Sequence, residues 1–178
     1  MSRLPVIVRY RERALDQAAI VSALALARMD EPGELAELTG RQDAQLVDLL
    51  HDFAFNGRKL IEATKRDAMG CAEYATRTTL FCGKESEEEN WDIKMFSLLE
   101  VFGRMIHSDH LSIARAHVPT ASGAPAPGAS AWAFRVSSDR DRAGEWNFVY
   151  IEFLITEFLK FDELLRHDIR LAEILLSP

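Results

Sequence analysis

The chain has 178 residues, of which 48% are hydrophobic and 28% charged, proportions typical of a soluble globular protein with one ordinary core. Its formal net charge of −7 argues against a protein that coats nucleic acid nonspecifically, because such binding needs clustered Lys and Arg. No apolar run approaches the roughly 20 residues that a membrane span requires, and the N-terminal stretch lacks the apolar core of a signal peptide. We therefore expect one cytoplasmic domain over residues 1–178, without membrane contact.

The N-terminal half of the chain is predicted to be helical. Residues 10–29 are rich in Ala and Leu and contain no Gly or Pro, which favours a helix. The β-branched run 5–10 before it could form a short strand on its own. A second helical stretch covers residues 34–66, with Gly40 as its predicted dividing point. Gly57 inside this stretch either allows close approach of another helix or partner chain, or is simply tolerated.

The middle of the chain combines an ambiguous segment with a strong helix signal. Residues 69–83 suit either a short helix or an extended segment, because Thr and apolar residues are mixed there. In the acidic run 85–89, Ser86 and Glu89 match a capping box, which predicts the first turn of a helix. Apolar residues at helical spacing then predict that this helix continues and faces the core through Trp91, Met95, Leu98, Leu99, Phe102 and Ile106.

The last third of the chain contains the predicted β-structure and a final helix. Residues 111–118 alternate as in a strand, and the Pro/Gly/Ala/Ser-rich residues 119–131 predict a mobile surface loop. Residues 132–151 have the pattern of a β-hairpin, and residues 152–176 that of a long amphipathic helix. The predicted fold is therefore mainly α: an antiparallel four- to five-helix bundle with a small β-hairpin inserted before the last helix.

The segment from Arg104 to His110, RMIHSDH, is the stretch that core packing explains least. An arginine presents a planar, permanently charged fork to phosphate oxygens, and a histidine can move protons near neutral pH. Held together at a helix end, the two could cleave a phosphodiester without a metal ion or other cofactor. Arg104 would stabilise charge on the phosphate, and His110 or His107 would act as the general acid or base.

An arginine followed after five residues by a histidine, inside a helical bundle, resembles the HEPN superfamily (higher eukaryotes and prokaryotes nucleotide-binding). The stretch GRMIHSDHL carries this resemblance. It implies a metal-independent endoribonuclease of a toxin–antitoxin or antiphage system that acts on RNA as a homodimer, with an antitoxin or other protein as a further partner. It also implies that some members have lost the catalytic residues and only bind.

The choice of histidine stays open at this level. On a straight helix Arg104 and His107 share a face, whereas His110 points about 120° away from Arg104. Only a helix that ends near Ser108 or Asp109 would bring His110 round.

Other interpretations of these residues remain. Arg104 could pair with Glu100, and the histidines could simply favour the negative end of a helix dipole. A metal site is a third interpretation, although its spacing matches no closed zinc pattern, and its ligands would be His107, Asp109, His110 and His117. In the competing functional class the chain is a non-catalytic regulatory protein that binds a partner protein.

Residues elsewhere in the chain complete the predicted site. Arg58, which follows Gly57, and Arg115 in the predicted strand are candidates for substrate binding. His51 lies among apolar residues of a predicted helix and is interpreted as a packing residue. Cys71 and Cys82 fit neither a disulfide framework nor a metal-binding pair and are interpreted as small apolar residues.

Overall fold

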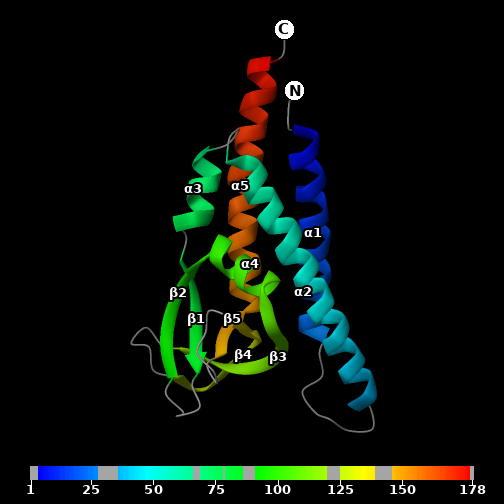
Figure 1. Cartoon of the computed structure of the whole chain (residues 1–178), viewed down its shortest axis with the longest axis vertical. Helices are drawn as coiled ribbons and strands as arrows, with labels where there is room; N and C mark the ends of the chain where they lie inside the picture. The colour runs from blue at the N-terminus through cyan, green and yellow to red at the C-terminus, as the bar shows by residue number, and fades with distance from the viewer. Residues whose placement is uncertain are drawn as a thin grey trace.

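The computed structural model describes residues 4–27, 36–65, 69–77, 79–85, 91–119, 125–138 and 146–176. Within these ranges the chain forms the helices α1 to α5 and a five-stranded antiparallel sheet. Helices account for most of the described residues, which confirms the prediction of a mainly helical fold. None of the helices described is both long and apolar enough to cross a membrane. Figure 1 shows the sheet at the lower end of the molecule, with α3 and the last turns of α5 at the upper end.

Two long helices, α1 (Leu4–Ala27) and α2 (Ala36–Thr64), lie side by side. The β-branched run 5–10 belongs to α1 and not to a strand, because its Ile7 starts a buried helical stripe. That stripe packs in the core and consists of Ile7, Ala14, Ala18, Val21 and Ala25. Gly40 lies inside α2 and does not divide it, contrary to the prediction.

The long C-terminal helix α5 (Ile151–Leu176) confirms the predicted final helix and runs antiparallel to α1 (Figure 1). Arg11 Nε donates to Asp162 Oδ1 at 2.6 Å, and this ion pair joins the two helices although Asp162 is only 1% exposed. In the core, Phe53 of α2 meets Phe158 of α5 edge to face, with ring centroids 4.9 Å apart. Phe102 packs edge to face on Phe53 at 5.3 Å, so three helices share one aromatic centre.

The sheet has the strand order β2-β1-β5-β4-β3, and every neighbouring pair is antiparallel. Its strands are β1 (Thr79–Glu85), β2 (Trp91–Ser97), β3 (Ser108–Pro119), β4 (Pro125–Ser138) and β5 (Trp146–Tyr150). The short helix α4 (Leu98–Ile106) carries the chain from the edge strand β2 to the opposite edge strand β3. The predicted hairpin is confirmed as β4 and β5, and the predicted strand 111–118 is confirmed as part of β3. The sheet is nevertheless much larger than one hairpin, so the predicted bundle with a small insertion describes the fold incompletely.

The prediction that one helix begins before Trp91 and runs through Phe102 is wrong for its first half. Residues 91–97 form β2, which pairs with β1 over its whole length. In the sequence WDIKM, apolar and polar residues alternate, which is the pattern of a strand. The apolar residues also fit the helical period of 3.6, but the structure follows the alternating pattern. Met95, predicted to face the core, is 49% exposed. The predicted capping box at Ser86 lies outside the described residues.

Two further boundaries differ from the sequence predictions. The ambiguous segment 69–83 divides into the helix α3 (Met69–Arg77) and the strand β1. Residues 125–131, predicted as loop, belong to β4 and pair with β3. This part of β4 has no partner strand on its other side within the described register, and such one-sided pairing tolerates proline and small residues. Residues 120–124 lie outside the described part.

The two sides of the sheet have different surroundings. On the helix-facing side, Phe134, Val136 and Val149 join the main core with residues from the helices. On the outer side, a smaller buried cluster consists of Ala116, Ala133, Phe148 and Tyr150. Because side chains alternate along a strand, the register assigns each described residue of β3 and β4 to one of these sides.

Candidate functional site

The helix α4 is fixed at both ends by local hydrogen bonds. Ser97 Oγ accepts from the backbone N–H of Glu100, and the Glu100 carboxylate accepts from the backbone N–H of Ser97, which together form a capping box. At the other end His107 is the C-cap, and its N–H donates to Gly103 O at 3.1 Å. The predicted site is therefore divided between two elements: Arg104 lies in α4, His107 at its end and His110 in β3.

A β-bulge separates the side chains that follow the helix. Ser108 pairs with Ser138 and His110 with Ser137, so two steps on β3 match one step on β4. Without the bulge, Ser108 and His110 would lie on the same side of the sheet. With it, Ser108 lies on the helix-facing side and His110 on the outer side, and such re-aiming of side chains is a known consequence of bulges.

Two polar contacts join α2 to the end of α4, Arg58 with His107 and His51 with Ser108, and we call these four residues the junction cluster. Arg58 Nη1 lies 3.5 Å from His107 Nε2. Ser108 Oγ donates to Met105 O at 2.8 Å and lies 3.5 Å from His51 Nε2. Because an arginine only donates, His107 Nε2 is the acceptor in its contact, and Ser108 can only accept from His51. The cluster thus places an arginine and an imidazole of α2 beside the imidazole at the end of α4 and the first hydroxyl of β3.

Acidic and basic neighbours on α2 orient Arg58. Its Nε donates to Glu62 Oε1 at 3.0 Å, and Lys59 Nζ donates to Glu62 Oε2 at 2.9 Å. The hydrogen bond from Lys59 lowers the pKa of Glu62, and Arg58 acts in the same direction against the opposing effect of burial. Glu62 therefore stays ionised at neutral pH and holds one edge of the guanidinium. The side chain of Arg58 is 33% exposed, which leaves the arginine accessible from solvent.

Two glycines allow α4 to approach α2 at this point. A Cβ on Gly57 would lie 2.5 Å from the Phe102 ring, so only a glycine fits there. This confirms the alternative in which Gly57 permits close approach of another helix. A Cβ on Gly103 would lie 3.3 Å from Arg58 Nη1. The absence of both side chains brings His107 within reach of Arg58.

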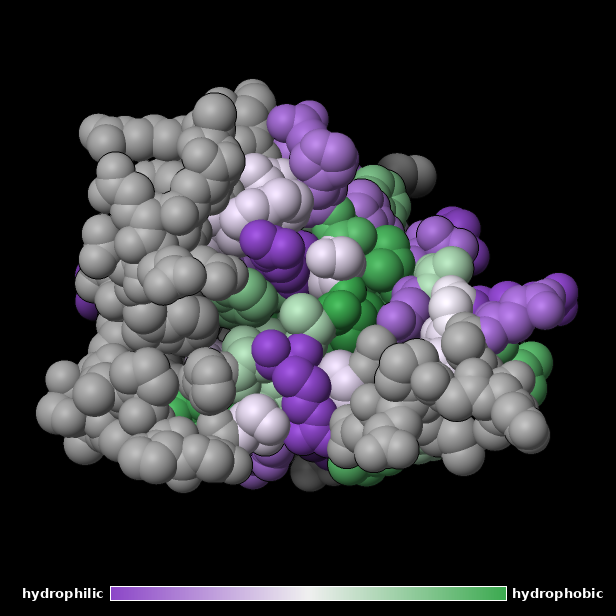
Figure 2. Space-filling view, turned by 90° about the horizontal axis from the view of Figure 1, so that it is seen from below, coloured by the Kyte–Doolittle hydropathy of each residue, from purple (hydrophilic) through white to green (hydrophobic). Residues whose placement is uncertain are grey.

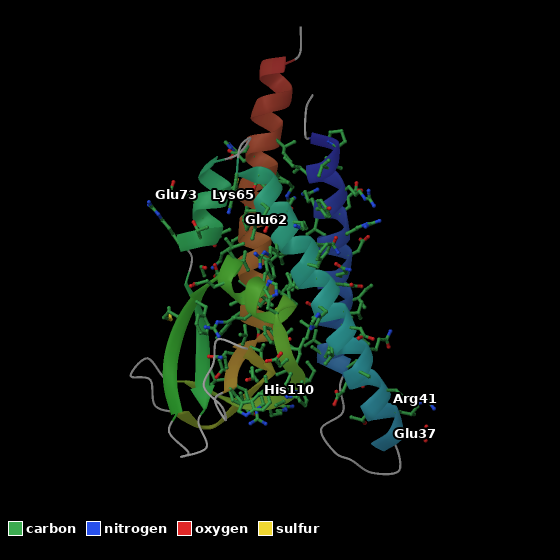
Figure 3. The ribbon with its side chains drawn as sticks, viewed as in Figure 1. Glu37, Arg41, Glu62, Lys65, Glu73 and His110 are labelled. Carbon is green, nitrogen blue, oxygen red and sulfur yellow. The ribbon has the colours of Figure 1, made fainter. Side chains whose placement is uncertain are left out.

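A second group of residues lies on the outer side of the sheet, and we call it the outer-face cluster: His110, Arg135 and Trp146. The guanidinium carbon of Arg135 lies 4.0 Å from the centroid of the Trp146 ring and 5.8 Å from that of Phe148. The His110 ring is 5.9 Å from Trp146 at an interplanar angle of 44°. His110 is exposed, and the other two residues are half-buried. Figure 3 labels His110 at the lower end of the sheet and Glu62 higher up on α2.

The structure places the other predicted site residues elsewhere. Arg104 stacks on Phe96 of β2, with its guanidinium carbon 4.3 Å from the ring centroid. His110 instead lies beside Trp146 of β5 on the outer side, so the predicted pair of Arg104 and His110 has different ring partners. Arg115 stacks on Trp132 at 4.5 Å, and its Nη1 donates to Ser130 Oγ at 3.2 Å. Two of the predicted site residues, His107 and Arg58, are in contact.

Four members of the two clusters are not among the predicted site residues, namely His51, Ser108, Arg135 and Trp146. His51 had been interpreted only as a packing residue. The spacing of His51 and Arg58, two helical turns apart, indicates a shared face of α2, but not what that face meets. For Arg135, the sequence shows the alternating aromatic and polar residues of the hairpin. It does not show the register against β5, which determines the residues that Arg135 contacts. The local sequence pattern indicated which face each residue shares with its neighbours, but not which residue it contacts on another element.

The described residues bear on the alternative metal site and on the interpretation of Cys71. No three His, Cys, Asp or Glu side chains among them gather closely enough to hold a metal ion, and the side chain of His117 lies outside the described part. Burial and the neighbouring Asp168 carboxylate raise the pKa of the Cys71 thiol to about 12. Cys71 is buried, as expected for a small apolar residue, with its thiol 3.1 Å from Asp168 Oδ2.

Two hollows of the described surface are lined by residues outside both clusters. One, of about 480 Å³, lies between α1 and α2 and is lined by Arg13, Asp16, Gln17, Asp52, Phe55 and Asn56. The other, of about 320 Å³, lies between the end of α1, β4 and the start of α5, and Leu26, Trp132 and Ile155 contribute to its walls.

No protein-family profile matches the chain, and no match was found among curated proteins or solved structures. The function is therefore argued from the geometry of the junction cluster and the outer-face cluster.

Proposed function

We propose that this protein is a metal-independent endoribonuclease whose phosphodiester site is formed by Arg58 and His107. One observation carries the proposal: a half-exposed arginine of α2 lies 3.5 Å from the imidazole of an exposed histidine at the end of α4. An arginine fork binds the oxygens of a phosphate, and an imidazole exchanges protons near neutral pH. The pair supplies both requirements of phosphodiester cleavage without a metal ion.

The chemistry assigns one role to each residue. When Arg58 turns from His107 Nε2 to the phosphate, this nitrogen accepts the proton of a ribose 2′-hydroxyl, and the 2′-oxygen attacks the adjacent phosphorus. The bond between phosphorus and the 5′-oxygen breaks, and this oxygen receives a proton through solvent water. The products are a 2′,3′-cyclic phosphate and a 5′-hydroxyl end. Arg58 donates to the non-bridging oxygens, whose charge grows in the transition state.

The wider HEPN-like assignment is part of the same proposal. In this proposal Arg58 is the phosphate ligand in place of Arg104, and of the two candidate histidines His107 is the general base. A homodimer, an antitoxin or other protein partner, and a cytoplasmic role in toxin–antitoxin or antiphage defence follow from the resemblance. Growth arrest on expression, relieved by an inactive variant, would support this setting.

Cleavage of a mixed single-stranded RNA by the purified protein in EDTA tests the proposal. At about 0.15 M salt the Debye length is about 8 Å, so distant acidic residues of this chain, whose net charge is −7, repel the RNA less. We expect Arg58→Ala to lower the cleavage rate at least 100-fold, which is the order of magnitude for losing one transition-state donor. Arg41→Ala is the matched control, since Arg41 forms an exposed ion pair with Glu37 on the same helix.

Two results would contradict the proposal as a whole, and a third would contradict its metal-independent chemistry. One is an intact RNA pool after incubation with the wild-type protein at high enzyme concentration. The other is an Arg58→Ala variant that keeps its fold and cleaves as fast as Arg41→Ala. If EDTA alone stops cleavage, the reaction depends on a metal, and the metal-independent roles of Arg58 and His107 are wrong.

A second candidate function, binding of a protein partner without catalysis, has its own observation. Large apolar side chains are exposed on the helices next to the 320 Å³ hollow, and Leu26, at 87% exposure, is the most extreme of them. Exposed apolar surface beside a hollow is typical of interaction sites. Replacing Leu26 with Lys should abolish such binding but leave RNA cleavage unchanged, so one variant separates the two candidates.

A further inference from the structure

The outer-face cluster presents three flat groups in one place. Arg135 lies over one ring, Trp146, at 4.0 Å, and the imidazole of His110 borders the same ring at 5.9 Å. Indole, guanidinium and imidazole planes are the groups on which proteins stack unpaired bases. The cluster also lies on an antiparallel sheet, whose flat surface suits an extended strand.

Polar groups border this stacking surface. Arg135 of β4 lies opposite Ser112 of β3, and Ser137 lies opposite His110, so two hydroxyl-bearing residues share the outer side with the cluster. Ser112 is exposed and Ser137 half-buried. Figure 2, which looks at the lower end of the molecule, shows hydrophilic side chains beside hydrophobic ones on this face. Hydroxyls next to a stacking ring can read the polar edge of a base.

The outer-face cluster begins three residues after the phosphodiester site. His107 belongs to the junction cluster and His110 to the outer-face cluster, and three residues of extended chain span about 10 Å. Between these two positions, the bulge in β3 turns Ser108 to the helix-facing side of the sheet and His110 to the outer side. Because β3 is an edge strand of the sheet, an extended single strand of RNA can pass around this edge from the helix-facing side to the outer side and reach both sites.

We infer that the outer-face cluster is a subsite that stacks one unpaired base of single-stranded RNA next to the cleaved phosphodiester. This inference rests on the proposed function and names its substrate class. The base stacks on the exposed His110 ring and against the Arg135 guanidinium, which covers one face of Trp146 and adds positive charge. A base inside a duplex is already stacked and paired, so the subsite selects single strands.

Binding of a fluorescein-labelled 2′-O-methyl oligoribonucleotide of mixed sequence, followed by fluorescence anisotropy, tests the inference. The methyl group blocks the attacking hydroxyl, so binding is measured without cleavage. We expect Arg135→Gln and His110→Ala each to raise Kd about 5- to 10-fold, within the range of single stacking contacts. The same oligonucleotide in a duplex should bind at least 10-fold more weakly than the single strand.

Arg77→Gln is the matched control. Arg77 lies on α3, away from the outer-face cluster, and its ion pair with Glu73 is exposed. Its substitution should change Kd less than 2-fold. His110→Ala alters an exposed side chain, so it keeps the test valid should Arg135→Gln disturb folding.

The outcomes separate this inference from the proposed function. Cleavage that is lost in Arg58→Ala, together with unchanged Kd in His110→Ala and Arg135→Gln, overturns the subsite and leaves the nuclease standing. Absence of cleavage by the wild type, with Kd raised by both variants, overturns the nuclease and supports the subsite. No binding of the oligonucleotide, or equal binding of single strand and duplex, overturns the subsite.

Discussion

The junction cluster and the outer-face cluster each combine an arginine with a histidine, but they hold the arginine differently. Arg58 is oriented by a carboxylate, Glu62, at 3.0 Å, whereas Arg135 lies on the ring of Trp146 at 4.0 Å. A carboxylate holds a guanidinium by its edge and leaves other N–H groups directed at an incoming anion. A ring holds it by its face, in the geometry that stacks on bases.

This difference suggests a division of labour across the bulge in β3. The junction cluster has the proton-transfer and anion-binding groups that a reaction needs. In the inferred subsite, the flat groups of the outer-face cluster would add binding energy equally to substrate and transition state. Such uniform binding changes KM and not kcat. The two clusters can therefore be separated by kinetics as well as by position.

The largest expected effect comes from exchanging the two histidines for alanine. We predict that His107→Ala lowers kcat about 100- to 10,000-fold, the usual range for a general acid or base. His110→Ala should leave kcat within 2-fold and raise KM several-fold, because it removes only a stacking contact. Single-turnover cleavage at saturating RNA measures kcat and its dependence on RNA concentration gives KM, with circular dichroism as the check on folding. A His110→Ala variant that loses kcat would reverse the division between the clusters.

The next effect concerns the packing that brings α4 to α2. Gly57→Ala places a methyl group 2.5 Å from the Phe102 ring, and this ring cannot move freely because Phe53 lies against it. We predict a loss of about 1–3 kcal/mol in unfolding free energy, typical of overpacking a core. Cleavage should fall as well, since the same contact positions His107.

Gly40→Ala in the same helix is the matched control for Gly57→Ala. Its new methyl group meets no atom within 4 Å, so better helix propensity should raise stability by about 0.5–1 kcal/mol. Urea unfolding of the two variants compares them directly. Equal effects from both glycines would mean that α4 does not approach α2 as described.

A smaller effect is expected at the start of α4. Glu100→Ala removes half of the capping box with Ser97 and should cost about 1 kcal/mol. Glu73→Ala also removes a helical carboxylate, but its ion pair with Arg77 is exposed, so we expect a loss below about 0.5 kcal/mol. Cleavage should decline only in Glu100→Ala, and oligonucleotide binding in neither. Weakened binding in Glu100→Ala would show that the outer-face cluster depends on α4.

The capping box also shows what the sequence could and could not determine. Ser–x–x–Glu occurs at Ser86 and again at Ser97, and the structure caps α4 with the second. Helix propensity, the hairpin and the final helix were predictable because each depends on neighbouring residues. The strand β2 was predicted wrongly because its residues fit both the helical period of 3.6 and the strand period of two. Pairing with β1 decides between the two, and local propensity does not show this pairing.

The site was predictable to the same extent. Local spacing predicted that only a helix ending near Ser108 or Asp109 would bring His110 round to Arg104, but α4 ends at Ile106 and His110 lies beside Trp146. The bulge that sends Ser108 and His110 to opposite sides depends on the register of β4, which no local pattern carries. Arg58 was included because it follows Gly57, but its contact with His107 joins positions 49 residues apart. Such contacts arise from tertiary packing, so spacing alone selected the residue types and not their partners.

The smallest expected effect is at Arg104, the residue that the sequence pattern places at the centre of the reaction. Its guanidinium stacks on Phe96 of β2, so Arg104→Ala should cost about 0.5–2 kcal/mol of stability from the lost cation–π contact. We predict that Arg104→Ala cleaves RNA within 2-fold of the wild-type rate at a temperature where both proteins are folded, whereas Arg58→Ala loses cleavage. Cleavage assays on both variants, with unfolding curves, measure the contrast. If Arg104→Ala is inactive and folded while Arg58→Ala is active, the phosphate ligand is Arg104, and the arginine held by Glu62 has only a structural role.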